Sequence, residues 1–475
     1  MKNYLILFFS ILNFAAFSQQ PATSSTDLED GLKQKQQLTE NSLVKNLPFK
    51  NIGPTIMSGR VTAIEVNPEN PIEFYISYAS GGVWYSNNNG TSFTPILDNS
   101  PTQDVGSLAV DWKTKTIWVG TGEVNASRSS YAGIGLLKST DQGETWENMG
   151  LLDSHHISSI LINPTNSNEI VVGVIGHLYS TNDERGVFKT LDGGKTWNKT
   201  LFVNNQTGII EVVVAPNNFN LMFASSWDKD RKAWNFRGSG EGSAIYKSID
   251  AGQTWTHVSG KGSGFPTGEG VGRIGLAIFD ENTVYAIHDN QSRRKEESKK
   301  DKKEGLSKED FKTMTAAELL ALDDKKLTKY LKSNRFPKKY TAESVKKSIK
   351  DGSVQPKDLA KYLEDANTLL FDTPVVGAEV YKSKDGGKTW NKTHDGFLDD
   401  IYYSYGYYFG KVHVALDNKD AIYIYGVPIL KSKDGGKTFV SIDAENLHGD
   451  HHALWINPKR SGHLINGNDG GLNIS

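Results

Sequence analysis

Short runs of alternating apolar and polar residues recur along most of the chain. Apolar segments of six to eight residues end in Asn-Pro or a similar turn, and a second short apolar segment follows each one. A period of two over such lengths is typical of half-buried β-strands. The first segments include Val61–Pro68, Ile157–Pro164, Ile209–Pro216 and Ala453–Pro458, and the second ones Phe74–Tyr78, Ile117–Gly120, Ile170–Ile175 and Leu221–Ser225.

An octapeptide with the pattern Ser/Thr-x-Asp-x-Gly-x-Thr-Trp/Phe follows these strand pairs. Its Asp can accept hydrogen bonds from its own turn, its Gly can adopt positive φ, and its aromatic residue begins the next strand. Five copies run Ser139–Trp146, Thr190–Trp197, Ser248–Trp255, Ser383–Trp390 and Ser432–Phe439, and in a sixth, Ser86–Phe93, Asn88 replaces the Asp. We therefore interpret five aspartates as structural: Asp141, Asp192, Asp250, Asp385 and Asp434.

The spacing of the octapeptides predicts an all-β fold, a β-propeller of four-stranded blades over residues 45–475. The copies recur roughly every 50 to 60 residues, which is the scale of one blade. Six complete units and a seventh that stops after three strands at Ser475 make seven blades the best count. Phe49–Ile52 resembles Trp146–Met149, a fourth strand, so we predict that it completes the last blade; the alternative is a larger, truncated propeller.

One interval between octapeptides, from Ser248 to Ser383, is far too long for a single blade. The excess, residues 291–370, is rich in Lys and contains the capping box Thr315-x-x-Glu318 followed by leucines at nearly helical spacing. We predict a helical insertion in the fifth blade. Its net charge is about +7, against about -9 for the rest of the chain. It is either a solvated helical flap or a docking site for an acidic partner.

The first 18 residues read as a signal peptide. Lys2 precedes an apolar run, and Ala16 and Ser18 suit a cleavage site before Gln19, so we expect a secreted or periplasmic protein with a flexible segment over residues 19–44. The run is too short to span a bilayer, and we expect no membrane span in the mature chain. A net charge of -2 argues against a nucleic-acid partner, and the sequence has no Cys for disulfides or lipid attachment.

Several motifs together resemble a known family. The octapeptides match the Asp-box, or BNR, motif, and Asn51-Ile52-Gly53-Pro54, Ser58-Gly59-Arg60-Val61 and the run His448–Pro458 accompany them. With these, the chain from about Leu47 to Ser475 is similar to the sortilin-like (VPS10-type) BNR propellers of secreted bacterial proteins, which are often labelled glycosyl hydrolases. The resemblance implies a propeller that is often one part of a longer protein; fold alone does not imply activity.

Two enzyme families use related repeats. The chain resembles sialidases only in the boxes, because it lacks their Arg-Ile-Pro motif. Xyloglucanase-like enzymes place an acid before Gly-Gly in the first blade, where this chain has Ala79-Ser80-Gly81-Gly82 and no carboxylate. The last blade does contain Asp469-Gly470-Gly471. A glycoside hydrolase needs two carboxylates about 5 to 10 Å apart; the candidates are Glu123, Asp399, Asp400, Asp450 and Asp469.

Long polar and aromatic loops are predicted on the face opposite the octapeptides, where we expect any function. The loops are Gly122–Ile134, His177–Gly186, Trp227–Gly242, Gly260–Arg273 and His394–Gly410. Candidate ligand-binding residues are Arg60, Tyr402, Tyr403, Tyr405, His448, His451 and His452. The histidine cluster has no standard metal spacing, and neighbours in a strand point to opposite faces, so we expect no metal and no cofactor.

Two functional hypotheses follow. The favoured one is a binding module for a glycan or a peptide, which acts through the loop-bearing face. The alternative is a glycoside hydrolase that uses a carboxylate pair. The octapeptides do not separate them because both classes use the same repeats, and no feature of the sequence indicates an oligomeric state.

Overall fold

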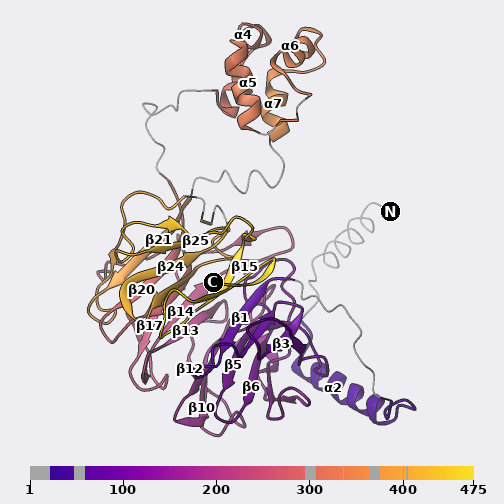
Figure 1. Cartoon of the computed structure of the whole chain (residues 1–475), viewed down its shortest axis with the longest axis vertical. Coiled ribbons are helices and arrows are strands. Elements are labelled where there is room, and N and C mark those ends of the chain that lie inside the picture. Colours follow the sequence, from indigo (N-terminus) through magenta and orange to yellow (C-terminus); the bar gives the residue numbers. More distant parts are fainter. Residues whose placement is uncertain are drawn as a thin grey trace, which may run out of the picture.

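The computed structural model describes residues 22–47, 59–294, 306–334, 336–337, 339–363, 375–399, 401–402 and 405–475. Its strands form a ring of seven antiparallel blades (Figure 1). Within these residues six blades have four strands and the last has three, and a two-stranded ribbon is the only other sheet. The predicted all-β, seven-bladed propeller is confirmed.

The blades follow one another along the chain. The first three are β1 (Val61–Val66), β2 (Phe74–Tyr78), β3 (Gly82–Ser86) and β4 (Thr94–Pro95); β5 (Val105–Asp111), β6 (Thr116–Thr121), β7 (Leu136–Ser139) and β8 (Glu147–Asn148); and β9 (Ile157–Asn163), β10 (Asn166–Val174), β11 (Gly186–Thr190) and β12 (Asn198–Leu201). The fourth and fifth are β13 (Thr207–Ala215), β14 (Asn218–Asp228), β17 (Ile245–Ser248) and β18 (Thr256–His257); and β19 (Val271–Ile278), β20 (Val284–Arg293), β21 (Val375–Ser383) and β22 (Asn391–Lys392). The last two are β23 (Lys411–Ala415), β24 (Asn418–Tyr425), β25 (Ile429–Ser432) and β26 (Val440–Ser441); and β27 (His451–Ile456), β28 (Leu464–Asn468) and β29 (Gly471–Ile474).

Each octapeptide forms the turn between the third and fourth strands of its blade. In the fifth blade, Asp385 Oδ1 accepts from Ser383 Oγ at 2.9 Å and Thr389 N at 2.9 Å, and Oδ2 accepts from Thr389 Oγ1 at 2.6 Å. Gly387 has φ +89°, which favours glycine. The first blade keeps the same pattern with an amide, since Asn88 Oδ1 accepts from Ser92 N at 3.0 Å.

The Trp of an octapeptide joins its blade to the preceding one. Trp197 Nε1 donates to the carbonyl of Met149 at 2.8 Å, and Trp146 Nε1 donates to the carbonyl of Ile96 at 3.1 Å. Met149 and Ile96 directly follow the fourth strands β8 and β4 of the neighbouring blades. Burial of a large ring with its N–H satisfied stabilises the stacking of one blade on the next.

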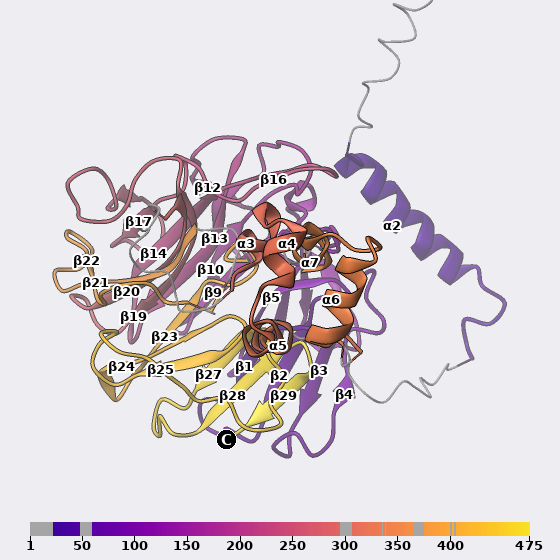
Figure 2. The ribbon, with the colours of Figure 1, turned by 90° about the horizontal axis from the view of Figure 1, so that it is seen from above.

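The first and last blades pack against each other and close the ring. Val61, Phe74 and Ile76 of the first blade share one hydrophobic core with Ala453 and Ile465 of the last. Figure 2 shows β27 to β29 beside β1 and β2. The segment Phe49–Ile52, predicted to be the outer strand of the last blade, lies outside the described residues.

The fifth blade carries the predicted helical insertion between β20 and β21. Its helices are α3 (Lys308–Thr313), α4 (Ala316–Leu320), α5 (Asp324–Ser333), α6 (Ala342–Lys350) and α7 (Pro356–Leu363). The expected capping box is present, with Thr315 and Glu318 bonded to each other's backbone N–H. The helices bury a core of their own, and Figure 1 shows them as a body apart from the blades. That core includes Phe311, Leu327, Leu331, Val345 and Leu359.

Helix α2 (Ser25–Glu40) occupies part of the segment 19–44. Ser24 caps it by accepting from Asp27 N, and none of its residues is buried. Among the residues that the structure describes, no helix is both long enough and apolar enough to cross a membrane. The predicted signal peptide, residues 1–18, lies outside the described part of the chain.

Candidate functional site

The two faces of the ring carry different connections. Antiparallel strands alternate in direction, so the links between second and third strands lie on the same face as the links between blades. We call this side the loop face. The octapeptide face carries the octapeptide turns and the links between first and second strands. The helical insertion lies in the link between the second and third strands of the fifth blade, and thus belongs to the loop face.

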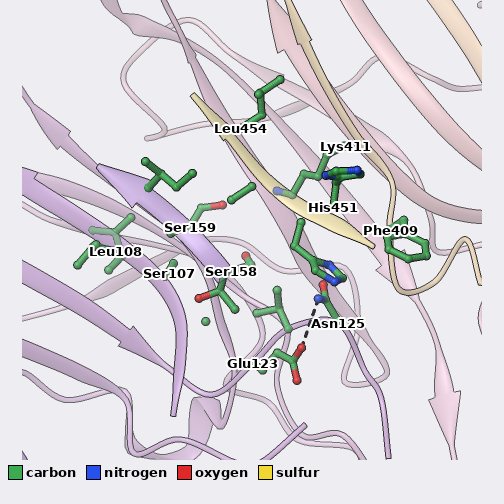
Figure 3. A pocket seen from close by; sticks show the side chains of 18 of the residues that line it. Ser107, Leu108, Glu123, Asn125, Ser158, Ser159, Phe409, Lys411, His451 and Leu454 are labelled. Carbon is green, nitrogen blue, oxygen red and sulfur yellow. Dashed lines mark hydrogen bonds between the residues drawn. The ribbon is translucent and has the colours of Figure 1, made fainter. Parts of the chain in front are cut away.

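A cavity of about 250 Å³ lies between the innermost strands of the blades. Its wall combines aliphatic residues with charged ones, including Lys411, which forms an ion pair with Glu211. Figure 3 looks into this cavity and shows Glu123 and Asn125, from a link of the second blade, beside residues of the inner strands. The candidate Glu123 therefore lies where the loop face meets the central channel.

Glu123 is the centre of a polar network and is only 2% exposed. Arg60 donates from Nε to Oε1 and from Nη2 to Oε2 at 2.7 Å. Ser130 Oγ donates to Oε2 at 2.7 Å, and Asn125 Nδ2 donates to Oε1 at 3.3 Å. Burial disfavours the charge of Arg60, but the hydrogen bonds and negative charge of Glu123, with the nearby Tyr408 and Asp469, together outweigh burial and raise the Arg60 pKa. Both carboxylate oxygens are thus engaged within the protein.

Aromatic residues and a second carboxylate lie next to this pair. The guanidinium of Arg60 lies 5.3 Å from the ring centre of Tyr408. His452 stacks on Phe409 with ring centres 5.3 Å apart, and its Nε2 lies 3.0 Å from Asp469 Oδ1. The structure therefore brings together Arg60, Glu123, His452 and Asp469, although they lie in different parts of the sequence.

Two neighbouring carboxylates of the seventh blade respond in opposite ways to their surroundings. Burial tends to raise the pKa of Asp469, but His452 and the charge of Arg60 lower it overall. Burial and the negative charge of Asp469 raise the pKa of Asp450. The backbone N–H of Asp469 donates to the carbonyl of Asp450 at 3.2 Å, so the two loops that carry them are in contact.

The other predicted site residues are more dispersed. Asp399 is exposed and pairs with Arg294 at 2.6 Å, at the base of the insertion. His451 is buried and bonds to Asn466 at 2.7 Å, whereas its neighbour His452 faces Asp469, so the two histidines do not converge. Tyr402 is buried, Tyr405 is half-buried and His448 is exposed. Asp400 and Tyr403 lie outside the described residues.

The sequence analysis predicted aromatic loops on the loop face but did not name the exposed aromatic side chains among its candidate residues. In the described part of the propeller, every aromatic residue at least 36% exposed lies on this face. On the octapeptide face the exposed large apolar residues are aliphatic, among them Leu191 and Ile249. The sequence does contain a signal for their exposure. An aromatic residue in a polar loop is not part of a strand that packs its ring into the core. These aromatics are Tyr131, Tyr179, Phe202, Trp234 and Phe397, with exposed fractions of 60%, 36%, 44%, 84% and 44%.

Comparisons with known proteins place this architecture among β-propellers. No family model and no curated protein sequence matches the chain. Similar solved structures include the GH74 xyloglucanase from Xanthomonas campestris, at 14% identity and a TM-score of 0.51 over 88% of this chain and 52% of that one. An ancestral GH74 enzyme is 15% identical, with a TM-score of 0.52 over 89% of this chain and 45% of that one. YCF48 from Cyanidioschyzon merolae is 11% identical, with a TM-score of 0.44 over 88% of this chain and 95% of that one.

The chain spans about half the length of these two GH74 structures. At such low identity the likeness shows a shared fold, the β-propeller, and not a shared activity.

Proposed function

We propose that this chain is an exported glycan-binding propeller of the sortilin-like BNR type, which holds its ligand on the loop face. The observation that carries the proposal is the one-sided distribution of exposed aromatic side chains. Exposed apolar surface that gathers in one region marks a binding site more reliably than scattered apolar residues do. Aromatic rings also suit sugars, since they present an apolar face to the C–H groups while polar neighbours bind the hydroxyls.

Three of these aromatics follow the curvature of the ring. Tyr131, Tyr179 and Trp234 lie on the links between second and third strands of the second, third and fourth blades. The Tyr179 hydroxyl donates to the carbonyl of Arg128 at 3.4 Å, which ties the third blade's loop to the second's. An arc of rings on consecutive blades fits an extended chain of sugars better than a single compact molecule.

Trp234 stands on a backbone of defined shape. It lies at the tip of a ribbon formed by β15 (Asp230–Arg231) and β16 (Phe236–Arg237), and Lys232 N donates to the Asn235 carbonyl at 2.7 Å across the turn. The guanidinium of Arg231 lies 4.0 Å from the ring centre of Phe236, which supports the base of the ribbon. A binding residue on a backbone of defined shape leaves less conformational entropy to be lost when a ligand binds.

The Arg60–Glu123 pair supports binding rather than acid–base catalysis in this proposal. A general acid must offer its proton to the substrate, and a base must accept one. Both oxygens of Glu123 are occupied by Arg60, Ser130 and Asn125. We infer that the pair is a rigid structural support for Tyr408 and the neighbouring loops.

A polysaccharide panel tests the proposal. The secreted chain is assayed against soluble β-glucans, xyloglucan, xylans and mannans for both binding and release of reducing ends. We expect retention by at least one glycan without product, and at least about tenfold weaker retention for Trp234→Ala, as for a central aromatic anchor. Absence of binding to every glycan, or binding that Trp234→Ala leaves unchanged, would overturn the proposal.

A glycoside hydrolase remains the second candidate because of Asp450 and Asp469. Two carboxyls whose pKa values are displaced in opposite directions suit an acid and a base, and the structural neighbours include a protein described as a xyloglucanase. If this candidate is right, the wild-type chain releases reducing ends from a glycan, and Asp450→Asn and Asp469→Asn each abolish release while leaving retention intact. Retention without release by the wild type contradicts it.

A further inference from the structure

Two loops of the loop face bring together a histidine pair and an aspartate that the proposed function does not use. Asp153 and His155 lie between β8 and β9, in and just after the short 3-10 helix η1 (Leu152–Ser154). His177 lies in the link between β10 and β11 of the next blade. One ligand atom from each of the three side chains lies within 4.8 Å of the other two.

The spacing of these groups suits a common ion. His177 Nε2 lies 2.9 Å from Asp153 Oδ1, and the rings of His155 and His177 stack with centres 3.7 Å apart. Imidazole nitrogens and carboxylate oxygens bind Zn²⁺ at about 2.0 to 2.2 Å, which places tetrahedral ligand atoms about 3.4 Å from one another. An imidazole binds a metal in its own ring plane, so the stacked rings of His155 and His177 must turn about their side-chain bonds before all three ligand atoms reach one ion.

The surroundings hold the ligands in place through further hydrogen bonds. Ser180 Oγ lies 2.7 Å from His177 Nδ1, on the far side of the ring from Asp153. Asn182 Nδ2 donates to Asp153 Oδ2 at 3.1 Å and to the Asp153 carbonyl at 2.6 Å. Such outer contacts are characteristic of protein metal sites, because they orient each ligand before the ion arrives.

A buried arginine fixes the loop that carries His177. Arg185 has an exposed fraction of 0%, and its Nη2 donates to the carbonyls of His177 at 2.9 Å and Ser180 at 2.7 Å. On the other loop, His155 adopts φ +55°, an unusual backbone for a residue other than glycine, and its carbonyl accepts from Gly133 N at 2.7 Å. Strain of this kind persists only where the surroundings impose it.

We propose that Asp153, His155 and His177 form a binding site for a first-row divalent transition metal, with zinc as the reference ion. Two imidazoles favour such a metal over calcium or magnesium, which prefer oxygen ligands. The Asp153 side chain is 35% exposed, so the ion faces solvent and keeps a coordination position for water or a ligand oxygen. The proposal of this site does not rest on the proposed glycan binding, and it differs from the expectation, drawn from the His448–His452 cluster, that the chain holds no metal.

Calorimetry on the full secreted chain tests the site. After treatment with EDTA and its removal, titration with ZnCl₂ is expected to show one equivalent bound with micromolar or tighter Kd, and a higher Tm at saturation. Titration with CoCl₂ is expected to give visible absorption bands of a four- or five-coordinate site. Absence of both heat and absorption would overturn the proposal.

Variants separate this site from adventitious surface binding. His177→Ala and the nearly isosteric Asp153→Asn are each expected to weaken zinc at least tenfold, with unchanged circular dichroism of the free protein. His257→Ala, which removes an exposed histidine from β18, is the matched control and is expected to bind like the wild type. If His177→Ala does not fold, the zinc affinity of Asp153→Asn alone tests the site. Wild-type affinity in Asp153→Asn, or equal loss in His257→Ala, contradicts the assignment.

Discussion

The two faces of this propeller are formed by the ends of the same strands, but the turns on one face are uniform and the links on the other are varied. On the octapeptide face, each of the five turns that carry an Asp repeats the same hydrogen bonds: the carboxylate accepts from the Ser or Thr two residues earlier and from the Thr four residues later. On the loop face nearly every link differs in length and content, charged groups such as Glu123 are buried, and the exposed aromatics gather there.

The contrast teaches where to look for function in a repeat protein. Features that recur in every blade hold the blades together, whereas a binding site needs a constellation that occurs once. The repeated aspartates of the octapeptides accept hydrogen bonds from their own turns, so we do not expect them to bind a ligand or to act in catalysis. The network around Glu123, the arc of aromatics and the Asp153–His155–His177 cluster each occur once in the described chain.

The largest effect on stability is expected from an octapeptide tryptophan. Trp390 is 2% exposed, packs on Phe265 and Tyr381, and donates to the carbonyl of Val258 at 3.3 Å. Trp390→Ala should lower the free energy of unfolding by about 3 to 5 kcal/mol, as other large-to-small core changes do. Urea denaturation measures this. Trp234→Ala on the loop face is the control and should change stability by no more than about 0.5 kcal/mol.

A smaller loss is expected from the buried pair of the loop face. Glu123→Ala leaves the guanidinium of Arg60 without its carboxylate, in surroundings where that side chain is only 17% exposed. We expect a loss of about 2 to 3 kcal/mol in urea denaturation, since an uncompensated buried charge is costly. Glu144→Ala, at an exposed position in an octapeptide turn, should be nearly neutral. Equal effects at the two glutamates would contradict the network described for Glu123.

Substitution of an octapeptide aspartate should destabilise the fold less than Trp390→Ala or Glu123→Ala. Asp385→Ala removes three hydrogen bonds near the surface, and we expect a loss of about 1 kcal/mol. Asp385→Asn should cost less than about 0.5 kcal/mol, because Asn88 makes the equivalent bonds in the first blade, where its Nδ2 donates to Ser92 Oγ at 2.8 Å. Thermal unfolding of the two variants in parallel distinguishes them, and a larger loss for Asn than for Ala would show that the charge itself is required.

The smallest expected effect per residue is on the pH dependence of stability, to which several octapeptide aspartates contribute. Hydrogen bonds from Thr389 lower the pKa of Asp385 to about 2, below the ordinary value of 3.8. Hydrogen bonds from Thr145 likewise lower the pKa of Asp141 to about 2. A carboxyl with a lowered pKa stabilises the fold above about pH 4, and this contribution disappears as the pH falls towards 2. Tm measured from pH 6 to 2 should fall over that window, and less steeply for Asp385→Asn.

Sequence patterns predicted the fold well because the octapeptides are local. Each one contains the acceptor, the donors and the glycine that its turn needs, so spacing alone predicts the blades and the insertion between β20 and β21. Arg60, Glu123, His452 and Asp469 were proposed as separate face candidates and meet at the mouth of the channel.

The rest of the site depends on contacts between loops that no local pattern encodes. Asp153 and His177 are separated by 24 residues and meet only because successive blades stack. Asp399 carries a suitable carboxylate but is paired with Arg294, a residue at the root of the insertion. Trp234 was missed because the ribbon that exposes it depends on Asp230 and Arg237 pairing across a loop that reads as irregular.

A comparison of two triple variants tests the central claim, that the loop face binds glycan, most directly. One variant, Tyr131→Ala with Tyr179→Ala and Trp234→Ala, removes the aromatic arc; the other, Leu191→Ala with Ile249→Ala and Leu416→Ala, removes exposed aliphatic residues of the octapeptide face. Affinity electrophoresis in gels containing the glycan that retains the wild type measures both. We predict at least about 100-fold weaker binding for the first variant and wild-type binding for the second. Equal retention of the two variants, or stronger loss in the second, would contradict the account.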